Sequence, residues 1–177
     1  MKPITDAGQV DRYRRFVDEM LLGEGTYERD FDLAWIQSRG WKVVPVKSEY
    51  GHFSPDDVER IVPALNAAGY TECLAVATER LDPLPVCYQV AVSKEDFRNF
   101  RRECGLLGYL LMDDDRGWVI SFYGKYKLFA GPASLLEKLL GTTISAARKD
   151  FAEFAQSLDI GLVGQPYTEM ASRYAAL

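Results

Sequence analysis

The chain has 177 residues, of which 47% are hydrophobic and 27% charged, and its formal net charge at pH 7 is −5. A chain of this length and composition is expected to fold as one globular domain, 1–177, without a stabilising disulfide or metal. The acidic balance argues against nucleic acid as a partner, because phosphate backbones attract a surplus of Lys and Arg. No run of about 18 apolar residues occurs, so the sequence predicts no membrane span.

The cysteines indicate a compartment. Cys73, Cys87 and Cys104 form neither an even set nor a metal-binding spacing, so we expect reduced, buried thiols. The N-terminus leads into a charged amphipathic helix and lacks the apolar core of a signal peptide. Together these features predict a cytoplasmic protein.

Apolar residues at helical spacing predict seven helices. The strongest start is Ser54 followed by Pro55 and two aspartates, and Pro63 should kink or shorten the helix that begins there. Gly141 should end another helix as a left-handed cap. In chain order, the predicted helices cover residues 6–22, 31–38, 54–69, 93–104, 133–140, 143–158 and 166–177.

Runs rich in β-branched and aromatic residues predict a sheet. Its five strands are expected over residues 72–79, 86–92, 107–112, 118–123 and 126–130. The run 41–47 contains Pro45, which cannot donate to a strand ladder, so it is an edge strand or no strand at all. Strands that meet through turns without regular βαβ alternation predict an α+β fold: a mostly antiparallel sheet of about five strands with helices packed mainly on one face.

Residues 116–131 are predicted to form a tight hairpin loaded with aromatic side chains. Gly124-Lys125 between two β-prone runs matches a two-residue type II′ turn. This turn pairs Tyr123 with Tyr126, and the register follows from that pair along both strands. Because alternate pairs point to opposite sides, the hairpin has two faces, and neither is properly polar.

We expect one face of the hairpin to pack on the apolar stripe of helix 143–158. This face carries Trp118, Ile120, Phe122 and Phe129, with Lys127 at its edge. The opposite face is rich in tyrosine; it is an interaction surface if it is exposed and scaffold if helices cover it. The candidate protein-binding residues, whose types supply large contact areas, are Tyr123, Tyr126, Ser121, Leu128 and Trp41.

Few residues are candidates for chemistry. Asp113 and Asp115 could present carboxylates to a divalent ion, but they lack the full calcium-loop pattern, and acidic residues are ordinary turn formers. His52, the single histidine, has no nucleophile in a strained elbow to act upon. The sequence therefore predicts no catalytic residue, no metal and no cofactor.

These features favour a non-catalytic cytoplasmic protein that binds another protein. Small acidic α+β proteins that neutralise toxins, such as bacterial immunity proteins, are similar in composition: negative charge steers them onto a basic partner, and aromatic side chains hold it. One alternative is a small carboxylate- or metal-dependent enzyme using Asp113, Asp115 or Glu79. The other is a small-molecule sensor with an apolar pocket beside Trp118 and Phe122.

Overall fold

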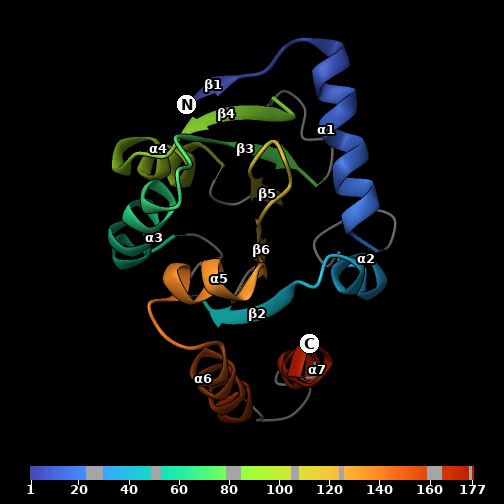
Figure 1. Cartoon of the computed structure of the whole chain (residues 1–177), viewed down its shortest axis with the longest axis vertical. Helices are drawn as coiled ribbons and strands as arrows, with labels where there is room; N and C mark the ends of the chain where they lie inside the picture. The colour runs from blue at the N-terminus through green and yellow to red at the C-terminus, as the bar shows by residue number, and fades with distance from the viewer. Residues whose placement is uncertain are drawn as a thin grey trace.

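The fold is a mixed one, with a single antiparallel sheet between helices. The computed structural model describes residues 1–22, 30–48, 53–78, 85–104, 108–123, 126–158, 165–175 and 177. Within these residues the chain forms a seven-stranded sheet with helices on both sides of it (Figure 1). The predicted α+β class is therefore confirmed.

The sheet contains the five expected strands and two more. In chain order, the strands are β1 (Lys2–Pro3), β2 (Lys42–Lys47), β3 (Glu72–Ala77), β4 (Cys87–Ala91), β5 (Tyr109–Met112), β6 (Val119–Tyr123) and β7 (Tyr126–Gly131). Their order across the sheet is β1-β4-β3-β5-β6-β7-β2, and every neighbouring pair is antiparallel. The prediction of about five strands was too low because both added strands are edges: β1 is too short to show alternation, and β2 carries Pro45.

Seven helices occur among the described residues. They are α1 (Ala7–Met20), α2 (Leu33–Ser38), α3 (Pro55–Ala67), α4 (Lys94–Cys104), α5 (Ala133–Leu140), α6 (Ile144–Ser157) and α7 (Gln165–Ala175). The expected caps are present: Ser54 and Asp57 form a reciprocal capping box on α3, and Gly141 ends α5 with a φ of 67°. Pro63 does not end α3, which continues to Ala67 with Pro63 on its exposed side. None of these helices has the length and apolar character that a membrane crossing requires.

Helices cover both faces of the sheet, so the prediction that they lie mainly on one face is wrong. One core lies between the sheet and α3, α4 and α5, and a second lies between the opposite face and α1, α2 and α7. In Figure 1, α3 and α4 lie on one side of the strands and α1 and α2 on the other. α6 lies along the β2 edge and contributes to both cores, through Ala147 to the first and Phe151 to the second.

The hairpin of β6 and β7 has the predicted register. Five pairs run from Val119 opposite Ala130 to Tyr123 opposite Tyr126. The turn itself, Gly124-Lys125, lies outside the described residues. Its packing differs from the prediction: the face that carries Trp118, Ile120, Phe122 and Phe129 lies in the core with α3, α4 and α5 rather than on the aromatic stripe of α6.

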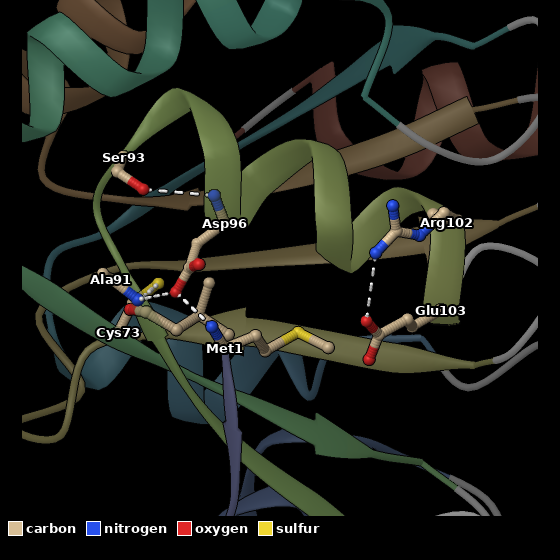
Figure 2. A network of polar contacts seen from close by, with 8 residues as sticks. Met1, Cys73, Ala91, Ser93, Asp96, Arg102 and Glu103 are labelled. Atoms are coloured by element: carbon tan, nitrogen blue, oxygen red, sulfur yellow. Dashed lines mark hydrogen bonds and ion pairs between the residues drawn. The ribbon is translucent and has the colours of Figure 1, made fainter.

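Both edges of the sheet are protected. At the β2 edge, Pro45 lacks an N–H, and Arg148 of α6 donates from Nη2 to the carbonyl oxygen of Val43 at 2.9 Å. At the other edge, β1 is only two residues long, and the amino group of Met1 lies 2.5 Å from Oδ2 of Asp96 (Figure 2). The same carboxylate oxygen accepts the N–H of Ala91 at 2.9 Å, so it joins β1, β4 and α4.

Candidate functional site

The tyrosine-rich face of the hairpin is covered. Ser121, Tyr126 and Leu128 are buried in the second core, and the Tyr126 ring packs edge-on against Phe151 of α6 and Tyr167 of α7, with centroids 6.0 Å and 5.8 Å away. The side chain of Tyr123 lies outside the described part of the chain. The described residues of this face therefore present no open surface, and the alternative in which they are scaffold holds. Helices α6 and α7 pack on this face.

Asp113 is a structural turn residue. It is buried, and its Oδ1 accepts the N–H groups of Gly117 at 2.5 Å and Trp118 at 3.0 Å. Burial raises the pKa of this carboxyl despite the two hydrogen bonds, which favour its charged form. Asp115 is exposed. Among the described residues, no three His, Cys, Asp or Glu side chains gather as a metal site would require.

The remaining candidates for chemistry are thiols and residues outside the described ranges. His52 and Glu79 belong to the latter. Cys73, Cys87 and Cys104 are free and buried, as predicted. Burial raises the pKa of all three thiols, to about 11 for Cys87 and about 12 for Cys104. They are therefore protonated at neutral pH, and a protonated thiol is a poor nucleophile.

The turn between β5 and β6 holds a non-glycine residue in a rare backbone conformation. Arg116 has a φ of 56°, and no other described residue except glycine has a positive φ. Such a conformation costs on the order of 1–3 kcal/mol and persists only where surrounding contacts enforce it. Here Asp113 fixes the two residues after Arg116, and Arg39 donates from Nη1 to the Arg116 carbonyl oxygen at 3.3 Å.

This conformation places the Arg116 guanidinium over an aromatic ring. Its Cζ lies 4.0 Å from the centroid of Phe16 on α1, and its Nη1 lies 2.6 Å from a carboxylate oxygen of Glu19. Distances of this order bring a cation onto the negative face of a ring. The ion pair and the stack together hold Arg116 in one orientation between α1 and the turn.

Arg39, the C-cap residue that follows α2, forms a second stack. Its Cζ lies 4.4 Å from the Trp35 ring centroid and 5.4 Å from that of Trp41, and the two indoles meet edge to face at 5.2 Å. Burial lowers the pKa of Arg39, and the charge of Arg116 lowers it further. No carboxylate of the described residues forms an ion pair with Arg39. We call Phe16, Trp35, Arg39, Trp41 and Arg116 the arginine–aromatic face.

The arginine–aromatic face is partly open to solvent. Arg39 is exposed, Phe16, Trp35 and Arg116 are half-buried, and only Trp41 is buried. Of the predicted binding residues, Trp41 alone belongs to it. The sequence offered one signal, the short spacing from Trp35 through Arg39 to Trp41. It offered none for Phe16 and Arg116, which meet only in the folded chain.

A small pocket lies beside Gln9 and Tyr13 of α1. Its volume is about 180 Å³. Its walls come from strands, from α1 and from the β5–β6 turn: Ile4, Gln9, Tyr13, Glu72, Cys73, Leu74, Gln89 and Asp114. No pattern in the sequence marks these residues as part of one site.

The chain matches no known protein-family model, no curated protein and no solved structure.

Proposed function

We propose that this chain is a non-catalytic, cytoplasmic protein-binding module, similar in kind to immunity proteins or inhibitors, and that it holds its partner through the arginine–aromatic face. One observation carries the proposal. Arg116 keeps a costly backbone conformation in which its guanidinium is stacked on Phe16 and its carbonyl accepts from Arg39. Backbone strain of this kind concentrates at functional sites.

The composition of the arginine–aromatic face supports this role. Trp and Arg are enriched among the residues that dominate binding energies at protein interfaces. Arg39 and Arg116 are already held against rings, so less side-chain entropy is lost when a partner orders them further. An exposed arginine without an ion pair among the described residues, Arg39, leaves guanidinium N–H groups for a partner's oxygen atoms.

Charge and cysteine chemistry support the remaining parts of the proposal. A net charge of −5 steers the chain onto basic partners and raises association rates at low salt. Three free, buried thiols suit a reducing compartment.

A capture experiment with matched charge reversals tests the proposal. The wild-type protein, an Arg39→Glu variant and an Arg102→Glu control are immobilised and exposed to native lysate from the source organism. Both arginines are exposed, but Arg102 lies on α4, which packs on the opposite face of the sheet. We expect the wild type and the control to retain the same stoichiometric protein, and Arg39→Glu to lose it.

Calorimetry with the purified partner then gives the magnitude. Loss of an interface hot spot costs about 2 kcal/mol or more, which is a roughly 30-fold weaker affinity. Equal retention by all three proteins, or no stoichiometric partner at all, would refute binding through this face.

A further inference from the structure

The pocket beside α1 combines an apolar wall with an acidic rim. Ile4, Leu74 and the ring of Tyr13 supply apolar surface, whereas Glu72 and Asp114 supply carboxylates. Oε2 of Glu72 accepts from Nε2 of Gln89 at 2.6 Å. That contact occupies one oxygen of Glu72 and orients the carboxylate at the rim.

An internal arginine already occupies the other carboxylate of the rim. Nη2 of Arg12 lies 3.2 Å from Oδ1 of Asp114, and both side chains are about half exposed, at 50% and 55%. The Arg12 Cζ also lies 5.3 Å from the Phe16 ring centroid and 5.6 Å from that of Tyr13. Asp114 thus already pairs with a guanidinium of the protein itself, and an ion pair this exposed is weak enough to exchange.

The volume of the pocket decides whether it fits a single side chain or a larger ligand. The volume of about 180 Å³ is several times the ~30 Å³ of one water molecule in the liquid. It falls short of the roughly 300–1,000 Å³ that small-molecule and cofactor sites occupy. One long side chain with an aliphatic stem and a charged end matches both the volume and the lining.

We propose that this pocket receives an arginine side chain of the protein partner, whose guanidinium replaces that of Arg12 on Asp114 and also contacts Glu72. The proposal rests on the protein-binding role proposed above and adds the chemistry of the partner. The aliphatic stem of an arginine matches the apolar wall, and its guanidinium matches the acidic rim. The negative net charge of the chain favours the approach of such a basic partner.

Nuclear magnetic resonance titration tests the pocket without the natural partner. The probe is the blocked tripeptide acetyl-Gly-Arg-Gly-amide, and its matched control carries citrulline, which has the same shape without the charge. We expect the arginine peptide to shift the backbone amide signals of Tyr13, Leu74 and Gln89 with an affinity of about 1–10 mM. The citrulline peptide should leave these signals in place.

Three variants sharpen the test. Glu72→Gln keeps an oxygen for Gln89 but removes the charge, and it should weaken binding of the arginine peptide at least fivefold. Arg12→Gln removes the internal competitor and should tighten binding by up to about fivefold. The control Glu103→Gln removes an exposed carboxylate on α4, across the sheet, and should leave the affinity unchanged.

Several results would overturn the assignment: no shifts at the pocket, equal shifts with citrulline, an unchanged affinity in Glu72→Gln, or weaker binding in Arg12→Gln. Tighter binding of free L-arginine than of the blocked peptide would assign the pocket to a metabolite instead. The two proposals fail separately. A pocket that ignores the arginine peptide leaves capture through Arg39 intact, whereas a failed capture beside a working titration refutes the arginine–aromatic face alone.

Discussion

Lys127 of β7 and Asp57 of α3 form an ion pair inside the first core. Only 2% of Lys127 and 7% of Asp57 are exposed, so both charges are removed from water. Asp57 also accepts the N–H of Ser54 at 2.9 Å and Nη2 of Arg60 at 2.7 Å. One carboxylate therefore caps α3 and neutralises an ammonium group of the sheet, which ties the start of the helix to β7.

Removing the ammonium group should be costly. Lys127→Met leaves Asp57 buried with fewer partners, and breaking a buried ion pair costs about 3–5 kcal/mol. Urea denaturation checks this value, with Lys149→Met on the exposed side of α6 as the control. The double variant Asp57→Asn/Lys127→Met should be more stable than the sum of the two single losses predicts, because neither charge is then left alone. Strict additivity would contradict the pairing.

The contact between the Met1 amino group and the Asp96 carboxylate should make the stability of the protein depend on pH in the acid range. Burial raises the pKa of Asp96, but the hydrogen bonds from the Met1 amine and the Ala91 N–H outweigh it, so the pKa is lowered overall. A carboxyl with a lowered folded-state pKa stabilises the protein above about pH 4 and loses that contribution as the pH falls through the lowered value.

Asp96→Asn therefore should reduce the free energy of unfolding at pH 7 and flatten its decline below about pH 4. Urea unfolding at a series of pH values measures both effects. Asp150→Asn, an exposed carboxylate of α6, serves as the control. An acid limb as steep in Asp96→Asn as in the wild type would rule out this contact as a source of the pH dependence.

Asp113 should have the opposite pH dependence. Burial raises its pKa, so its contribution is fully present below the ordinary carboxyl pKa of about 4 and is lost as the pH rises through the folded-state value. Asp113→Asn keeps an oxygen for the Gly117 and Trp118 N–H groups without the charge. Its stability relative to the wild type should thus increase from acid to neutral pH.

The alanine variant separates the charge of Asp113 from its hydrogen bonds. Asp113→Ala leaves two N–H groups without their acceptor, and each costs about 1–3 kcal/mol if it stays unsatisfied. Thermal unfolding at pH 5 and pH 7 compares the variants on the scale of a shift of about 2–4 °C per kcal/mol. Equal losses in the asparagine and alanine variants would show that the acceptor role is minor.

Arg148 should protect the β2 edge from other chains. Arg148→Met removes the donor to Val43 and keeps an apolar stem, so we expect a loss of about 1–3 kcal/mol and a greater tendency to associate. Urea denaturation gives the first quantity and size-exclusion chromatography the second. Lys149→Met, one residue later on the exposed side, controls for the lost charge. A monomeric, fully stable Arg148→Met would assign edge protection to Pro45 alone.

Local patterns in the sequence predicted the elements better than their packing. Capping at Ser54, the left-handed Gly141 and the hairpin register all depend on nearest neighbours, and each was confirmed. Which face of the sheet a helix covers depends instead on the path of the chain between the elements. The apolar stripe of helix 143–158 was recognised, but α6 lies along β2, and its Phe151 meets Tyr126 on the tyrosine-rich face of the hairpin rather than the face that carries Trp118.

The residues of the candidate sites were harder still to predict from the sequence. Phe16 and Arg116 become neighbours only because α1 lies beside the β5–β6 turn, and Glu72 and Asp114 share a pocket for a related reason. The hydrophobic periodicity of the sequence carries no information on pairs of residues that are distant along the chain. Asp113 was selected for its carboxylate, yet burial and two backbone N–H groups give it a role in shaping the turn.

The order of strands has a consequence for synthesis on the ribosome. The two edge strands come first in the chain, but β1 pairs with β4 and β2 pairs with β7, whose residues emerge much later. The five central strands can form by successive antiparallel pairing as they leave the exit tunnel. β1 must wait unpaired until β4 has been translated and β2 until β7, so both edge strands stay exposed to chaperones and to neighbouring nascent chains over similar lengths of translation.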